Sequence, residues 1–277
     1  MMAWRMPASY RRFLWFCTAL SIALFALVAG ETYAYIFLST LPHSSLDAFV
    51  YVYSWVGSIY IMDAITDYIL YRKVRSHPLA STFKLYFFMI YFIFYRNLFA
   101  RLRSVDQFAI VQLGSFLWVC LYYPLAMTKY THHWLVRLFG TTLTYDEYKL
   151  KIGRSFYLRN LAENTTMLGF LCWVNILHFG PNRAAFPYFD FDRQVSDESP
   201  YTHKMTFIAA LIIWTSELTS AYITRHTFKR VFRHSVTEQA IREFTQYPEM
   251  IVGYILVMVH VMQNILLALI QLDFAPL

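Results

Sequence analysis

Two aspartates, Asp63 and Asp67, stand four residues apart in the apolar run IYIMDAITDYIL. On a helix this spacing places both carboxylates on one face, where they repel each other unless a cation lies between them. Carboxylate oxygens are the ligands that Mg²⁺ prefers, so the pair suits a magnesium site. The alternative is an ion pair with one of the cations that follow, which are Arg72, Lys73 and Arg75.

A second acidic pair, Asp146 and Glu147, lies in the segment TYDEYKLKIGRS beside Lys149 and Lys151. A solvated loop is the simplest interpretation of such a pair. The charge pattern described below, however, places both acidic pairs on the same side of a membrane. Two carboxylate clusters with nearby cations are what a magnesium diphosphate site requires, because the metal bridges acid and phosphate oxygens while the cations neutralise the leaving group.

A third polar group lies within apolar sequence near the end of the chain. His260, Gln263 and Asn264 are three and four residues apart, so a helix presents them on one face, and Glu217 in the preceding apolar run is a candidate partner. Such side chains commonly form hydrogen bonds between membrane helices. A proton or quinone site is the alternative for this intramembrane polar cluster.

The composition places these residues in a membrane protein. The chain has 277 residues, of which 58% are hydrophobic and only 15% are charged, against roughly 25% charged residues in soluble domains. This excludes an ordinary soluble enzyme and a disordered chain. It also argues against a nucleic-acid partner in spite of the formal charge of +7, because excess Lys and Arg in membrane proteins marks the inside loops.

We therefore predict one all-α integral membrane domain, 1–277, built as a bundle of transmembrane helices. A bilayer crossing needs about 20 apolar residues. Seven segments are candidates, and they are 13–38, 48–70, 83–99, 106–127, 163–179, 205–224 and 250–272. Segments 83–99 and 163–179 are short, so a partial or tilted crossing is the alternative for these two.

The distribution of Lys and Arg orients the helices. The N-terminus and the segments 71–84, 128–162 and 225–249 are basic, whereas 39–47 has no Lys or Arg. The pattern predicts the N-terminus inside and the C-terminus outside. One connection disagrees, because Arg96, Arg101 and Arg103 would lie outside. The two long inside segments, 128–162 and 225–249, are predicted to be helical and amphipathic at the membrane surface.

The order of these motifs resembles the UbiA-type membrane prenyltransferases. In that family the first acidic motif runs into an Arg-Pro-Leu-Ala-Ser-like turn, and here the first pair of aspartates is followed by His77-Pro78-Leu79-Ala80-Ser81. The further matches, in the family's order, are Tyr123-Pro124-Leu125, the acidic pair before Ile152-Gly153, and Glu163-Asn164-Thr165. The resemblance covers roughly residues 50–170. The first motif lacks its leading Asn, and about two of the family's nine helices are missing.

The resemblance implies a Mg²⁺-dependent enzyme acting on an isoprenoid diphosphate, or a relative that has lost catalysis. It implies that Asp63, Asp67 and Asp146 hold the metal, with Glu147 as a fourth catalytic carboxylate. Cations that bind the diphosphate would then be Arg72, Arg75, Lys149 and Lys151.

A different class of function stays open, which is a non-catalytic subunit of a large membrane complex, such as a respiratory or ATP synthase assembly. Membrane lipids and other membrane subunits are the partners expected in that case. A transporter is less favoured, because no paired broken helices are evident. Among membranes, the mitochondrial inner membrane is preferred over the endoplasmic reticulum.

Overall fold

The computed structural model of this chain describes residues 8–39, 45–99, 105–140, 142–181 and 203–271. The described residues form helices and contain no β-strand, which confirms the all-α prediction. The long helices are α1 (Ala8–Ser39), α2 (Ser45–Tyr68), α3 (His77–Phe99), α4 (Val105–Leu117), α7 (Tyr145–Phe179), α8 (His203–Val231) and α10 (Glu249–Gln271). The short helices are α5 (Tyr123–Ala126), α6 (Lys129–Phe139) and α9 (Val236–Gln246), and two π-helical segments, Ile69–Val74 and Trp118–Tyr122, follow α2 and α4.

Five stretches within these helices are long and apolar enough to span a membrane, and they are Ala8–Ile36, His77–Arg96, Ala109–Ala126, Thr206–Val231 and Glu249–Leu267. Large hydrophobic side chains are exposed along most of them, for example Phe25 in α1, Leu121 after α4 and Leu256 in α10. In water such a surface would be unfavourable, whereas lipid tails are as apolar as the side chains themselves. The protein is therefore suited to the interior of a bilayer.

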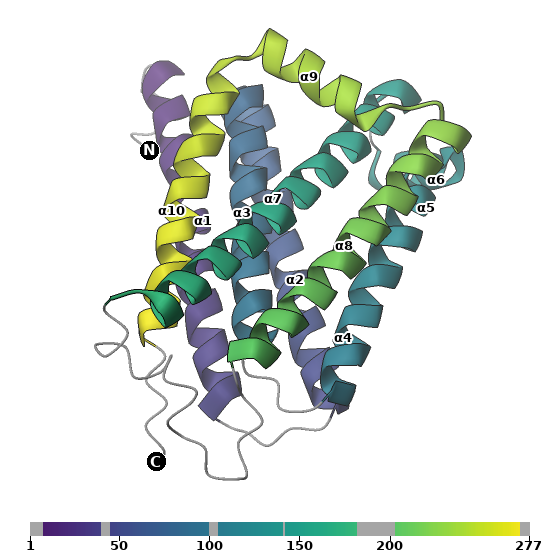
Figure 1. Cartoon of the computed structure of the whole chain (residues 1–277). Coiled ribbons are helices and arrows are strands. Elements are labelled where there is room, and N and C mark those ends of the chain that lie inside the picture. The colour runs from purple at the N-terminus through teal and green to yellow at the C-terminus, as the bar shows by residue number, and fades with distance from the viewer. Residues whose placement is uncertain (1–7, 40–44, 100–104, 141, 182–202, 272–277) are drawn as a thin grey trace.

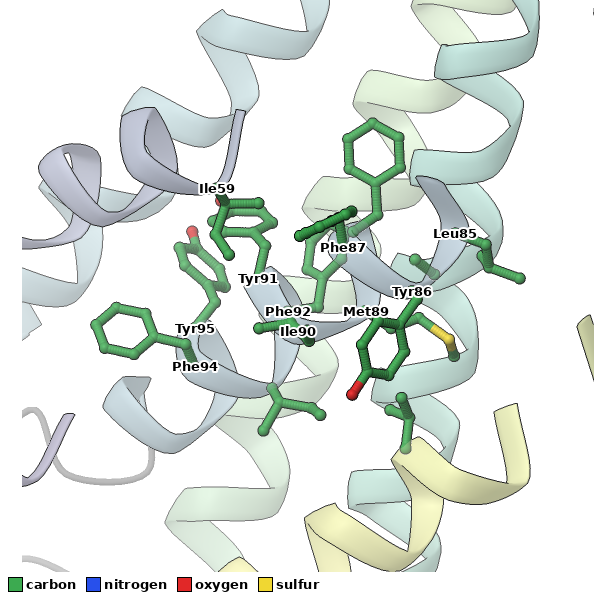
Figure 2. Packing of buried hydrophobic residues seen from close by; sticks show 14 of the residues in the cluster. Ile59, Leu85, Tyr86, Phe87, Met89, Ile90, Tyr91, Phe92, Phe94 and Tyr95 are labelled. Atoms are coloured by element: carbon green, nitrogen blue, oxygen red, sulfur yellow. The ribbon is translucent and has the colours of Figure 1, made fainter. Parts of the chain in front are cut away.

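Helix α3 is the central element. It packs against α1, α2, α7 and α10, and nearly every side chain from Leu85 to Arg96 is buried. Figure 2 shows Tyr91 and Tyr95 directed toward Ile59 of α2, with Tyr86 on the opposite side of the helix. A helix that is apolar all round is expected at the centre of a bundle, so the segment described above as short is the best buried of the spans.

The prediction for residues 128–179 needs correction. The segment 163–179 is not a separate helix, because it is the second half of α7, a single helix of 35 residues that starts at Tyr145. At 1.5 Å per residue this helix is about 52 Å long, well beyond a hydrocarbon core of about 30 Å. It therefore extends from exposed residues at its start, such as Asp146 and Glu147, into the bundle, where Phe156, Leu158 and Arg159 are already buried.

Helix α9 crosses the end of the bundle at which α7 and α10 begin (Figure 1). The guanidinium of Arg154 in α7 donates to both carboxylate oxygens of Glu243 in α9, at 2.7 and 2.9 Å. The amide of Gln239 donates to the carbonyl of Leu150 at 2.7 Å. These contacts fasten α9 to α7, so the predicted amphipathic helix in 225–249 is held by polar bonds as well as by its apolar face.

Candidate functional site

The first acidic pair is held together by a lysine of the neighbouring helix. Asp63 and Asp67 lie on one face of α2, as their spacing predicts, and both are buried. Between them lies Lys84 of α3, whose Nζ is 2.5 Å from Asp63 Oδ2 and 3.3 Å from Asp67 Oδ2. Lys84 is the last residue of the basic segment 71–84, and it lies in the second turn of α3. The ion-pair alternative therefore describes the site, with a different cation.

A second lysine completes this cluster. Lys151 of α7 lies with its Nζ 3.8 Å from Asp67 Oδ2. Two carboxylates thus face two ammonium groups, and their formal charges cancel. In the described part of the chain, no three His, Cys, Asp or Glu side chains are grouped so that they could hold a metal ion. This arrangement does not fit the magnesium site implied for Asp63, Asp67 and Asp146, because ammonium groups already lie where the metal would be needed.

The second acidic pair has a local role. Asp146 is 85% exposed and pairs with Lys149 at 2.9 Å, one turn along the same helix. Glu147 accepts hydrogen bonds from the backbone N–H and the hydroxyl of Thr144, both at 2.8 Å, and forms a capping box at the start of α7. These bonds lower the pKa of Glu147. Both residues are thereby explained by the beginning of a helix.

The four cations that were expected to bind a diphosphate do not form one group. Arg72 and Arg75 are exposed beyond the end of α2, where Arg75 has a left-handed backbone with φ of 61°. Lys149 and Lys151 pair with different aspartates. The structure therefore brings Lys151 to the first acidic pair. It leaves Arg72, Arg75 and Lys149 at the surface, apart from that pair.

A buried ion pair lies deeper in the bundle. Arg96 near the end of α3 donates to both carboxylate oxygens of Glu217 in α8, at 3.1 and 2.6 Å, and each side chain is only 2% exposed. The prediction that Arg96 belongs to an outside loop is wrong, because this residue lies within α3. Arg101 and Arg103 lie outside the described residues. A charged pair at this depth is costly to bury, so its geometry must be close to ideal.

A second buried pair lies beside the first. Arg159 and Glu163 of α7 are one turn apart, with Arg159 Nη1 3.2 Å from Glu163 Oε1. The two pairs are joined by the Arg96 guanidinium, which also donates to the backbone carbonyl of Glu163 at 3.5 Å. The other end of the Arg159 guanidinium donates to Ser115 Oγ of α4 at 3.4 Å. We call Arg96, Arg159, Glu163 and Glu217 the buried ion network, and its formal charges cancel.

The polar group in α10 connects two helices. His260 lies 3.2 Å from the Asn264 amide and 3.5 Å from the hydroxyl of Tyr86 in α3. Gln263 is exposed on the same helix. Glu217 was expected to join this group, but its carboxylate is bound by Arg96 instead. The hydrogen-bonding interpretation of the group therefore agrees with its geometry.

A cavity of about 230 Å³ lies against the buried ion network. Its walls come from α2, α3, α4 and α7, and they are formed by Tyr53, Val56, Gly57, Tyr60, Tyr91, Ser115, Trp118 and Arg159. The walls are thus aromatic with one guanidinium at the base. Pockets of a few hundred Å³ lined by apolar and aromatic groups, with a few convergent polar groups, are typical of ligand sites.

The cavity opens between α2 and α4. Gly57 of α2 and Trp118 after α4 are both exposed, whereas Ser115 and Arg159 at the inner wall are buried. A Cβ built on Gly57 would meet no atom within 4 Å, so this wall has free space beside it. Trp118 begins a π-helical turn, Trp118–Tyr122, a kind of irregularity that is frequent at functional sites.

A smaller pocket of about 10 Å³ extends the cavity toward the first acidic pair. It shares Val56, Tyr60 and Tyr91 with the cavity and is also lined by Asp63. The sequence-predicted Asp63 therefore lies next to the cavity, although in an ion pair. The other lining residues were not predicted from the sequence. The one sequence feature that could have indicated a site here is the pair Arg159 and Glu163, whose i, i+4 spacing precedes an apolar run.

Comparisons with known proteins show matches along nearly the whole chain. Residues 1–270 match the family described as SPCC553.12c. This chain belongs to that family. It is 39% identical, over 267 residues, to the uncharacterized protein C553.12c of Schizosaccharomyces pombe (strain 972 / ATCC 24843). The match covers 96% of this chain and 50% of the relative, so the chain spans about half the length of that protein. No solved structure matches the chain.

The geometry directs attention to the cavity of this SPCC553.12c-family chain. The two ionic groups beside it, the Asp63–Asp67 cluster and the buried ion network, are each balanced in charge within the described residues. They can hold the helices that form the walls in fixed positions. The aromatic walls and the Arg159 guanidinium are then the groups available to a ligand.

Proposed function

We propose that this protein is a seven-span membrane protein that binds a lipid in the cavity between α2 and α4. Five spans are long and apolar enough by themselves, and we add α2 and the second half of α7. Figure 1 supports the assignment, since α1, α3, α7 and α10 start at the end crossed by α9, whereas α2, α4 and α8 start at the opposite end.

We further propose that the end crossed by α9 is the inside. Basic residues gather there, including Arg72, Lys151, Arg154 and Arg230, and the positive-inside rule assigns such an end to the cytoplasm or matrix. Helix α6 fits the boundary on this side, because Tyr130, Trp134 and Leu138 form an exposed stripe at helical spacing. The mitochondrial inner membrane remains our preferred location.

One observation carries the lipid-binding proposal, which is the cavity of about 230 Å³ with exposed Gly57 and Trp118 at its mouth and buried Arg159 at its base. An apolar entrance at bilayer depth favours a lipid over a water-soluble ligand. A guanidinium behind aromatic walls favours a lipid with a polar head.

The enzyme hypothesis receives less support. A magnesium-dependent prenyl transfer needs two carboxylate motifs free to share a metal, whereas Asp63 and Asp67 are paired with lysines and Asp146 and Glu147 serve the start of α7. If the resemblance to UbiA-type prenyltransferases reflects ancestry, we propose that catalysis has been lost. A role as a subunit of a larger membrane complex is compatible with lipid binding and stays a prediction.

The experiment is to purify the protein in mild detergent and measure bound lipid by native mass spectrometry. We expect one lipid per chain in the wild type. The variant Gly57→Leu, whose Cβ would meet no atom within 4 Å, should lose this lipid while unfolding at the same temperature. A wild-type protein with no bound lipid, or a variant that keeps it, would contradict the proposal.

A further inference from the structure

The hydrogen-bonding groups of the cavity are one guanidinium, which only donates, and several hydroxyls, which can donate. Arg159 has five N–H donors and no acceptor. Its Nη1 is used by Glu163 and its Nη2 reaches Ser115 at the long distance of 3.4 Å. Tyr60 and Tyr91 also line the cavity, and within the described residues neither hydroxyl has a hydrogen-bond partner, although Tyr91 is only 8% exposed. A ligand with acceptor oxygens suits all three residues, because the guanidinium only donates and each phenol can donate.

The charge balance around the cavity determines whether the acceptor oxygen of the ligand can carry a negative charge. Arg159 is compensated by Glu163, and Arg96 by Glu217. Asp63 and Asp67, behind the smaller pocket, are compensated by Lys84 and Lys151. An anionic head would add an uncompensated negative charge to a low-dielectric site, which is costly. The cavity therefore suits an uncharged acceptor.

The shape of the walls indicates the rest of the head. The ring of Trp118 stacks on Tyr122 with centroids 4.5 Å apart and planes 8° apart. The ring of Tyr60 lies across the site, 6.4 Å from Trp118. Val56 and Gly57 leave an apolar, open side on α2. Flat aromatic surfaces of this kind pack well against a flat ring in the ligand.

We propose that the ligand of this cavity is an uncharged aromatic or quinonoid lipid whose ring carbonyl accepts hydrogen bonds from Arg159, Tyr60 and Tyr91. The inference rests on the proposed function and adds the chemistry of the head to it. The lipid tail leaves the cavity through the opening beside Gly57.

The test compares three probes of the head alone, which are duroquinone, durene and tetramethylbenzoate. They share one methylated ring and carry two carbonyls, no oxygen and one carboxylate, respectively. Binding is measured by equilibrium dialysis against the full chain in lipid nanodiscs, with the uptake by protein-free nanodiscs subtracted. We expect saturable binding of duroquinone, weaker binding of durene by about tenfold or more, and no saturable binding of tetramethylbenzoate.

Variants that each remove one hydroxyl test whether Tyr60 and Tyr91 bind the carbonyl of the probe. Tyr91→Phe and Tyr60→Phe should each weaken duroquinone binding by about three- to tenfold and leave durene unchanged, because each loses one hydrogen bond. The control is Tyr95→Phe, one turn along α3, where the lost hydroxyl bonds to Gln112 and does not line the cavity. Neither test variant removes a hydrogen bond among the described residues, so both are expected to fold.

Two outcomes would overturn the inference. If tetramethylbenzoate binds as tightly as duroquinone, the head is anionic. If the two tyrosine variants bind duroquinone as the wild type does, the carbonyl is not held by these donors. Either result leaves the proposed function in place when a lipid is still found in the purified wild type and is absent from Gly57→Leu. Failure of that lipid measurement contradicts the proposed function itself.

Discussion

The guanidinium of Arg96 in α3 and the carboxylate of Glu217 in α8 form a two-bond ion pair, although 121 positions separate them in the sequence. The pair lies beside Arg159 and Glu163, and these four residues connect α3, α7 and α8. Helix α3 contributes Tyr91 to the cavity and Lys84 to the Asp63–Asp67 cluster. The position of Arg96 therefore links the stability of the bundle to the geometry of the cavity.

The first prediction concerns this pair. Glu217→Leu leaves a buried guanidinium without its partner and should lower the free energy of unfolding by about 3–5 kcal/mol. The double variant Arg96→Met with Glu217→Leu should recover much of that loss. Thermal unfolding in detergent measures both. The control is Arg242→Met, which removes an exposed pair with Glu238 and should cost less than about 1 kcal/mol. Equal effects of the buried and exposed changes would argue against the pair.

The second prediction concerns Lys84. Lys84→Met leaves Asp63 without a cation and should lower the melting temperature, since an unpaired buried carboxylate is costly. Adding Asp63→Asn should restore much of it, because Asp67 keeps Lys151. A melting temperature unchanged by Lys84→Met would show that the lysine does not hold the two aspartates.

The third prediction concerns magnesium. Because ammonium groups neutralise Asp63 and Asp67, neither added Mg²⁺ nor a chelator should change the melting temperature of the wild type. Asp146→Asn should behave in the same way, since Asp146 is a surface residue. A rise in melting temperature with Mg²⁺ that Asp67→Asn removes would restore the magnesium hypothesis and with it the prenyltransferase.

The fourth prediction concerns Gly153, where α7 and α9 approach closely. A Cβ on this residue would lie 2.4 Å from His234 Nε2 and 2.6 Å from Gln239 Oε1. Gly153→Ala should therefore displace both side chains and break the bond from Gln239 to Leu150. Hydrogen exchange of the α9 amides should become faster. Gly57→Ala, where the new methyl meets nothing, is the matched control, and equal exchange in the two variants would contradict the close approach.

The fifth prediction is a pH dependence of α9. Burial raises the pKa of Glu243, but the hydrogen bonds and the charge of Arg154 lower it by more than burial raises it. The net shift of this pKa is therefore downward. Burial lowers the pKa of His234. In both cases the unfolded group binds protons more readily, so stability falls as the pH falls. The contribution of His234 is complete above its ordinary pKa of 6.5 and that of Glu243 above 4.5.

Hydrogen exchange of α9, corrected for the intrinsic pH effect, measures this dependence. Protection of the α9 amides should decrease below about pH 6 and again in the acid range where Glu243 is protonated. The variant Glu243→Gln should lose the second step and retain the first. The facing charged groups are Arg154 and His77 near Glu243, and Lys149 and Arg242 near His234. Protection that rises on acidification would contradict the assignment.

The sequence predicted local relationships better than distant ones. The shared face of Asp63 and Asp67 follows from their spacing, and the all-α class follows from composition. Their partner Lys84 could not be identified, because the packing of α2 on α3 decides which cation is close. The same reason hid Arg96 and Glu217, since nothing local to either residue indicates the other.

The start of α7 could have been predicted from the sequence. Thr144 and Glu147 match the pattern of a capping box, in which the residue three positions on returns a hydrogen bond to the cap. Emphasis on the acidic character of Asp146 and Glu147 led to a catalytic interpretation instead. The cavity could not be predicted from the sequence, because its walls come from four helices. They include residues such as Tyr91, whose sequence surroundings are those of any buried core residue.

The most direct test of the central claim is a cryo-EM map of the wild-type protein in nanodiscs of native lipid. The account predicts elongated density between α2 and α4, with its head within hydrogen-bond distance of Arg159 and Tyr91 and its tail passing Gly57. A well-resolved cavity that holds only water, or walls that have closed together, would contradict the claim that this protein binds a lipid there.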